Sequence, residues 1–377
     1  MTRRSLLALF ANTAVSPGGP SSRFPSLRYA HGRLALSWLS QQPDGARSFV
    51  CSLREPNGDW TPPLTITNSP RLMINWADFP TVLPLSNGSL VAHWLERDSA
   101  PGAYGIRIAF RSPGANQEWR TSYSSPPSDQ GYEGFVSLLE NRTGARAGVW
   151  ASYLDHRSPK TALRALRFSP DGSRLENTTV DPDVCSCCQT SLIDTDRNEL
   201  LLAYRGHTSS EIRDILLATH SGRSWNPQPR SVFPDHWRIN ACPVNGPALD
   251  RHGSLIAFAW YTAEPNPRVL ATLSADSGRT FSKPVRLDTG AHTLGRVAVA
   301  AVSPTTAAIA FLEQGSVRLR YLSLDGTLSP AQDLDSVSTS RSSGFPRLAA
   351  TPDGLFAAWT TSTQGIQIRS LPVSKLL

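Results

Sequence analysis

The sequence predicts an all-β protein: a seven-bladed β-propeller with four antiparallel strands in each blade. Two observations predict this fold. A short strand that ends in an aromatic residue recurs seven times, and another short strand precedes each copy. Self-similarity at a regular interval is typical of repeat folds, and here the units are roughly 50 to 57 residues long.

The two strand series keep one register along the chain. The aromatic residues that end the second strand of each unit are Trp38, Trp94, Trp150, Tyr204, Trp260, Phe311 and Trp359. The preceding strands open near Arg23, Asp78, Gly134, Cys188, Asn245, Gly295 and Gly344. Turn residues such as Asn87-Gly88 separate the two series, which indicates antiparallel hairpins. Third and fourth strands follow, as in 268–273 and 282–287, and they leave no room for helices.

One turn carries a resemblance to a known family. The segment Ser274-Ala-Asp276-Ser-Gly278-Arg-Thr280-Phe281 fits the pattern Ser-x-Asp-x-Gly-x-Thr-Trp/Phe, and degenerate copies occur at 56–60, 169–172, 219–225 and 325–326. This pattern resembles the Asp-box, or BNR repeat, of sialidase-superfamily propellers. The resemblance implies the fold and places these turns on the face opposite the ligand site. Sialidases usually have six blades, so a six-bladed propeller with one irregular unit is the alternative.

The chain is expected to form a single domain, 1–377. Its seventh unit lacks a fourth strand, which residues 1–20 are expected to supply through Ser5–Phe10, covering an open sheet edge. The alternative for this segment is a remnant signal peptide, because Arg3 and Arg4 precede an apolar run. A periplasmic or secreted location follows from the second reading, with the cytoplasm as the alternative.

The amino-acid composition limits the classes of molecule that the protein is expected to bind. The net charge is +7, yet the basic residues are almost all arginines scattered along the chain, and no nucleic-acid-binding motif is present. No apolar stretch is long enough to span a membrane. Arginine favours carboxylates because its planar fork binds them through two parallel hydrogen bonds. We therefore expect a monomer that binds an acidic carbohydrate or another carboxylate-bearing small ligand.

Propeller geometry gathers the starts of the first strands and the ends of the second strands at one mouth of the axial channel. The polar residues predicted at this mouth are Arg23, Asp78, Glu133, Asn245, Arg205, Tyr261, Arg296 and, from a following loop, Arg213. The arginines and Asn245 are expected to bind an acidic sugar, and Asp78 and Glu133 are expected to transfer protons.

The family resemblance implies an exo-α-sialidase-type glycoside hydrolase with an arginine triad, an acid/base Asp and a Tyr nucleophile. Arg23-Phe24-Pro25 resembles the family's first arginine motif, and Tyr261 or Tyr132 would be the nucleophile. The chain departs from the pattern because it has no Asp at a suitable distance after Arg23. A non-catalytic propeller that binds glycans or proteins remains the alternative.

Cysteines suggest a third function. Cys185, Cys187 and Cys188 lie in one loop, and Cys242 and His292 occupy the positions equivalent to Cys185 in the next two units. Thiolates with an imidazole suit Zn or Cu, so these five residues are candidate metal ligands in a metal-binding propeller. The alternative is a Cys185–Cys242 disulfide. Cys51 is expected in the core.

Overall fold

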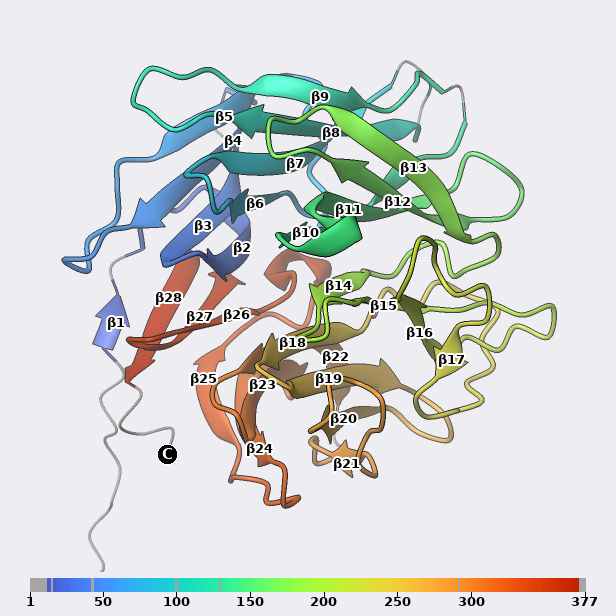
Figure 1. Cartoon of the computed structure of the whole chain (residues 1–377). Helices are drawn as coiled ribbons and strands as arrows, with labels where there is room; N and C mark the ends of the chain where they lie inside the picture. Colours follow the sequence, from blue (N-terminus) through green and yellow to red (C-terminus); the bar gives the residue numbers. More distant parts are fainter. Residues whose placement is uncertain are drawn as a thin grey trace, which may run out of the picture.

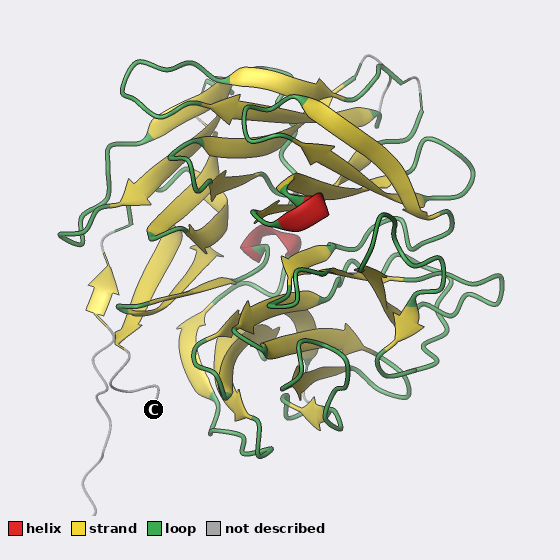
Figure 2. Ribbon diagram, in the orientation of Figure 1, coloured by secondary structure: helices red, strands yellow, loops and turns green. Residues whose placement is uncertain are grey.

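The structure of the protein is a computed structural model. It describes residues 12–14, 16–41, 44–98, 100, 102–128, 130–290 and 292–372. These residues form seven four-stranded antiparallel sheets arranged around a central axis (Figure 1). The prediction of a seven-bladed propeller is confirmed, and the six-bladed alternative is wrong. Helix within the described residues is limited to two short 3-10 turns, Gly144–Arg146 and Arg341–Ser343 (Figure 2).

Each blade contributes one strand to each of four concentric layers. The innermost strands are β2 (Ser22–Ala30), β6 (Thr81–Pro84), β10 (Glu133–Asn141), β14 (Ser191–Asp194), β18 (Ala248–His252), β22 (Thr293–Ala301) and β26 (Arg347–Thr351). The second strands are β3 (Arg33–Gln41), β7 (Leu90–Arg97), β11 (Gly148–Asp155), β15 (Leu200–Arg205), β19 (Leu255–Thr262), β23 (Thr306–Glu313) and β27 (Gly354–Thr361). The third strands are β4 (Arg47–Arg54), β8 (Tyr104–Arg111), β12 (Ala162–Phe168), β16 (Ile215–His220), β20 (Arg268–Ser274), β24 (Ser316–Ser323) and β28 (Gly365–Pro372). The outer strands are β5 (Leu64–Asn68), β9 (Arg120–Ser124), β13 (Arg174–Asp181), β17 (Arg230–Ser231), β21 (Val285–Arg286), β25 (Gln332–Ser336) and β1 (Asn12–Ala14).

The ring closes between the two ends of the chain. Strand β1 pairs antiparallel with β28, with Asn12 opposite Ser370 and Ala14 opposite Ile368, and completes the last blade. The strand expected at Ser5–Phe10 lies outside the described residues, as does the signal-peptide segment.

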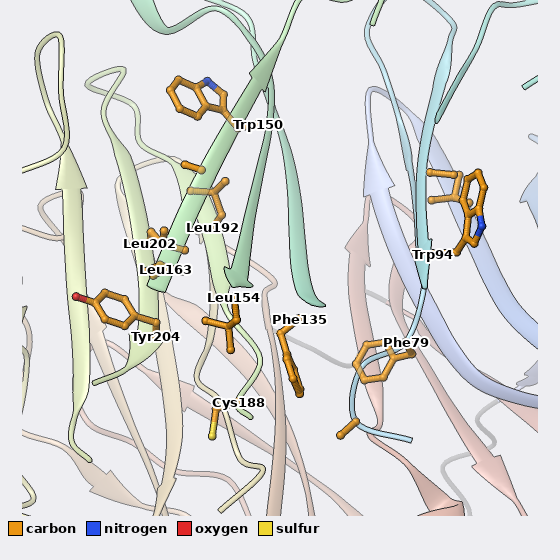
Figure 3. Close-up of a cluster of buried hydrophobic side chains, with 14 of the residues drawn as sticks. Phe79, Trp94, Phe135, Trp150, Leu154, Leu163, Cys188, Leu192, Leu202 and Tyr204 are labelled. Atoms are coloured by element: carbon orange, nitrogen blue, oxygen red, sulfur yellow. The ribbon is translucent and has the colours of Figure 1, made fainter. Parts of the chain in front are cut away.

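The seven aromatic residues of the repeat form the cores between the blades. Each is buried, and Trp150, Trp260 and Phe311 are at most 1% exposed. Figure 3 shows Trp94, Trp150 and Tyr204 on their strands, with Cys188 at the lower end of the same apolar cluster. Cys51 also lies in this cluster, as expected. Large aromatic side chains each bury a large apolar area and so stabilise the packing between blades.

The innermost strands of three blades begin with a bulge. The pairing register shifts between Arg23 and Ser26 in β2, and equivalent shifts follow Gly134 in β10 and Gly295 in β22. Phe24, Phe135 and Arg296 adopt positive φ at these bulges. A bulge redirects the side chains beside it, so the residues that open a strand do not all point into the channel.

No helix among the described residues is long and apolar enough to cross a membrane.

Candidate ligand site in the axial channel

The innermost strands enclose a cavity of about 120 Å³ on the axis. Each of the seven repeats contributes one residue at an equivalent position to the lining of this cavity. This residue lies three places after the residue that opens the repeat, and we call it the fourth position. Six of these side chains are small and the seventh is an arginine: Ser26, Thr81, Ser137, Ser191, Ala248, Ala298 and Arg347. Small side chains leave the channel open, and Arg347 from β26 enters it.

Arg347 has hydrogen-bonding capacity that the protein does not use. Its guanidinium carbon lies 3.8 Å from the centroid of the Phe79 ring, while Nε and Nη2 are buried without a hydrogen-bond partner. Burial, together with the nearby charge of Arg28, lowers the pKa of Arg347 to about 9. The side chain is therefore still charged at neutral pH. Arg28 also lines the channel, where its Nη2 donates to the Leu138 carbonyl at 2.9 Å.

Asp78 is the single acidic residue among those that line this cavity. It is 2% exposed; the Phe135 amide donates a hydrogen bond to the carboxyl, and Oδ2 has no partner. Gly134 makes room for it, because a Cβ at that position would collide with Oδ2. Burial raises the pKa of Asp78 to about 7. The carboxyl can therefore carry a proton near neutral pH and donate it to a ligand.

Arg205 and Asn245 have structural partners in place of a ligand. The buried Arg205 guanidinium donates to the carbonyl oxygens of Asn245, Arg213 and Tyr261 and lies over the Trp237 ring. The Asn245 side chain accepts from the Arg296 amide at 2.6 Å and donates to the Pro243 and Leu294 carbonyls. Both residues fix the loops around them.

The guanidinium groups of Arg296 and Arg23 also donate hydrogen bonds to other groups of the protein. Arg296 donates to the Ser340 and Gly344 carbonyls and to the Ser343 hydroxyl, and it stacks on Trp76 at 4.7 Å. Arg23 donates to the carbonyls of Pro20, Ser22 and Ser362. The bulges at these two positions turn the side chains toward neighbouring loops. The structure does not bring the predicted arginines together as a carboxylate clamp.

Glu133 lies in a separate place from Asp78. It is fully buried and accepts hydrogen bonds from Tyr123 and Ser125, and it forms an ion pair with Arg157. Tyr123, Glu133 and Arg157 border a second cavity of about 210 Å³, beside strands β9, β12 and β13. Burial raises the pKa of Glu133 as well. The prediction that Glu133 shares the axial pocket is corrected, because the first residue of β10 points between two blades.

Neither candidate tyrosine has the environment of an activated nucleophile. The Tyr261 ring packs edge-on against Trp237 at 5.6 Å, and within the described part of the chain no carboxylate hydrogen-bonds to its hydroxyl. Tyr132 stacks on Tyr104 at 4.8 Å and donates to the Ser186 carbonyl. Burial raises the pKa of both hydroxyls, which opposes deprotonation.

The cysteine loops do converge, at the same end of the channel. The sulfur atoms of Cys185, Cys187 and Cys188 lie within 4.8 Å of one another, and all five cysteines of the chain are free thiols. Arg213 donates to the Cys185 sulfur at 3.3 Å and pairs with Glu211. Cys242 and His292 are both exposed and lie outside this group of three, so the place of His292 among the ligands stays a prediction.

Comparison with known proteins identifies the fold. No protein-family model and no curated protein matches the chain. Among solved structures, it is similar to the BP39L lectin from Burkholderia pseudomallei, with 11% identity and a TM-score of 0.62 over 94% of this chain and 100% of the lectin. An ulvan lyase of a polysaccharide lyase family, bound to -[GlcA(1-4)Rha3S]-, gives 12% identity and a TM-score of 0.60 over 96% and 95% of the two chains. The intramolecular trans-sialidase from Ruminococcus gnavus gives 11% identity and a TM-score of 0.52 over 99% of each chain.

The chain therefore shares the β-propeller fold of a lectin, a polysaccharide lyase and a trans-sialidase. At such low identities the likeness establishes the fold alone, since one fold serves many activities. Which ligand the protein binds depends on the side chains of its site.

Arg347 and Arg28 are not among the site residues predicted from the sequence of this propeller. The signal was present in the repeat alignment, where six units have a small residue at the fourth position and the seventh has Arg347. Arg28 lies two residues after Ser26 on β2, and residues two apart on a strand point to the same face. A comparison of side-chain size at the fourth repeat position would have identified Arg347.

Proposed function

We propose that this protein is a carbohydrate-active propeller that receives the acidic group of a sugar in its axial channel. One observation carries the proposal: Arg347 points into the channel with Nε and Nη2 unpaired. A buried guanidinium without partners is costly, and a carboxylate or sulfate would satisfy it with charge-assisted hydrogen bonds. The cavity holds roughly eight to twelve water-sized spheres, which suffices for the acidic group while the sugar ring stays at the mouth.

Asp78 complements Arg347 in this proposal. While protonated, its carboxyl donates a hydrogen bond to the ligand; once ionised, it repels the ligand's negative charge. The neighbours with this fold include a lectin and a lyase bound to a chain that contains GlcA, a sugar with a carboxylate. These neighbours support acidic carbohydrates as the class of ligand. The residues proposed to recognise the acidic group are those of this protein.

Binding of N-acetylneuraminic acid, glucuronic acid and inorganic sulfate, measured by calorimetry, tests the proposal. We expect at least one of these anions to bind, and Arg347→Met to weaken it more than about tenfold, equivalent to about 1.4 kcal/mol. Arg142→Met, an exposed arginine, is the matched control. Equal binding of glucuronic acid and neutral glucose, or unchanged binding by Arg347→Met, would contradict the proposal.

The pH dependence of binding tests the part played by Asp78. Affinity for the anion should fall as pH rises through about 7, because Asp78 then loses its proton. Asp78→Asn should remove this dependence and keep an intermediate affinity at every pH. An unaltered pH profile in the variant would show that another group titrates.

A proton donor in the channel also favours a second candidate function, cleavage of an acidic glycan. We propose Asp78 as the general acid, because its pKa, raised to about 7, leaves a large share of the carboxyl protonated near neutral pH. Fluorogenic sialosides and uronate-containing polysaccharides are the substrates to test. Asp78→Asn should reduce turnover about 100-fold or more, and Glu133→Gln should retain it. If the wild-type protein turns over none of them, the binding proposal stands without catalysis.

A further inference from the structure

Two loops at the mouth bring four cysteines together, outside the lining of the axial cavity. Cys185, Cys187 and Cys188 lie just before β14, and Cys242 lies before β18 in the adjacent blade. The Cys185 sulfur is 3.9 Å from that of Cys187 and 3.7 Å from that of Cys188. The Cys242 sulfur lies 3.7 Å from the Ser186 hydroxyl, beside the group of three sulfurs that lie within 4.8 Å of one another.

The spacing of the sulfurs suits a metal ion. A tetrahedral thiolate site with metal–sulfur bonds of about 2.3 Å places its sulfurs about 3.8 Å apart. The two distances to Cys185 differ from this value by about a tenth of an ångström. Disulfide-bonded sulfurs would instead be about 2.05 Å apart.

Arg213 places a positive charge against the cluster. Its guanidinium contacts the Cys185 sulfur at 3.3 Å, and Arg213 is itself paired with Glu211. A cation beside a cysteine favours the thiolate, which is the form that binds a metal.

The two loops are held in place before any metal binds. The Arg205 carbonyl accepts from the Cys185 amide at 3.0 Å, while its guanidinium donates to the Asn245 carbonyl, three residues after Cys242. Tyr132 donates to the carbonyl of Ser186 between the cysteines. Arg205 therefore acts as a positioning residue that connects both loops. Cys185, Cys187 and Cys188 are buried, whereas Cys242 is exposed and leaves the cluster accessible from solvent.

We propose that Cys185, Cys187, Cys188 and Cys242 bind one thiophilic metal ion, Zn²⁺ or Cu⁺. Both ions prefer thiolate sulfur. Each cysteine that ligates the metal loses its thiol proton to solvent, and no electron is transferred. This site is independent of the acidic-ligand proposal, because its residues do not line the axial cavity.

Metal content of the full-length protein tests this proposal. The protein is purified under reducing conditions without chelator and analysed by elemental mass spectrometry, and the apoprotein is then titrated with Zn²⁺ and, anaerobically, with Cu⁺ against competing chelators. We expect one ion per chain. Co²⁺ added in place of Zn²⁺ should give the intense sulfur-to-metal absorption and visible bands of a tetrahedral thiolate site. Tight Cu⁺ binding without a Co²⁺ signal would assign the site to Cu⁺, and the reverse would assign it to Zn²⁺.

Two variants and one control separate ligation from folding. Cys187→Ser removes a thiol whose sulfur lies 3.9 Å from that of Cys185, and should weaken metal binding more than about 100-fold, since loss of an outer partner alone costs about 10- to 100-fold. Cys242→Ser changes an exposed residue, so its fold should be intact by circular dichroism while its affinity falls. Cys51→Ala should bind metal like the wild-type protein.

Thiol counting gives the result that would overturn the site. If the denatured wild-type protein shows two oxidised cysteines within the cluster and no metal, the cysteines form a disulfide. If five thiols are free and neither Zn²⁺ nor Cu⁺ binds more tightly to the wild-type protein than to Cys187→Ser, the cluster does not bind metal. Neither result bears on anion binding by Arg347, so the two proposals fail separately.

Discussion

At the scale of single residues, environment gives the same side chain opposite properties. Asp78 is buried in the channel with one oxygen unpaired, and burial raises its pKa to about 7. Asp276 accepts hydrogen bonds from the Thr280 amide and hydroxyl at 2.9 and 2.7 Å, and these bonds lower its pKa. The first carboxyl is suited to donate a proton, whereas the second acts as a fixed acceptor that shapes a turn.

The raised pKa of Asp78 predicts a pH-dependent stability. The folded protein binds a proton at Asp78 between pH 3.8 and about 7, where the unfolded chain does not. The stability that the folded protein gains from this bound proton is fully present below pH 3.8 and is lost as pH rises to about 7. The difference corresponds to up to about 4 kcal/mol. Asp78→Asn should therefore unfold at a higher denaturant concentration than the wild-type protein at pH 8, with little difference at pH 4.

The exposed Asp59 provides the control for this measurement. Asp59→Asn should follow the wild-type protein at both pH values. If Asp78→Asn is equally destabilised at pH 4 and pH 8, the carboxyl does not change its protonation in that range.

At the scale of elements, turns and bulges decide where the strands present their side chains. The turn between β20 and β21 is closed by Asp276 together with the Ser274 hydroxyl, which accepts from the Gly278 amide at 2.8 Å, and Gly278 has φ of 83°. Phe281 then packs on Phe258 at 5.9 Å. β20 leaves the cysteine end of the channel, so this turn lies at the opposite end of its blade.

We predict that Asp276→Ala destabilises the protein by about 1 to 2 kcal/mol, the usual effect of losing such hydrogen bonds. Chemical denaturation measures this change. Asp325 makes a single bond of this kind, to the Thr327 amide, so Asp325→Ala is a matched control with a smaller effect. Because the turn is far from the channel mouth along the blade, neither variant should alter binding of anion or metal. An altered affinity in Asp276→Ala would contradict this separation.

At the scale of the whole molecule, closure depends on the pairing of β1 with β28. This pairing covers an edge that would otherwise offer free backbone groups to another chain. It also joins segments more than 350 residues apart in the sequence. The stability of the ring therefore depends on a three-residue strand.

Truncation tests the closure. A chain that begins at Ser16 lacks β1, and we expect a lower melting temperature and some self-association through the exposed edge of β28. A chain that begins at Asn12 retains the strand and should behave like the full-length protein. Thermal unfolding and light scattering measure both properties; identical behaviour of the two truncated chains would mean that β1 does not stabilise the ring.

The sequence alone determined the repeat, the number of blades and the ring of buried aromatic residues. These features depend on local patterns: alternation along strands, turn residues and one large aromatic residue in each unit. The Cys185–Cys188 loop and Cys242 were also placed together correctly from register, because equivalent loops of adjacent blades are neighbours in any propeller.

Only the tertiary structure decided which polar side chains face the channel. Bulges in β2, β10 and β22 redirect the residues beside them, so Arg23, Glu133 and Arg296 point elsewhere. Hydrogen bonding to carbonyls from distant loops occupies Arg205. Such outcomes depend on backbone twist and on partners far apart in the chain, which a repeat alignment does not contain.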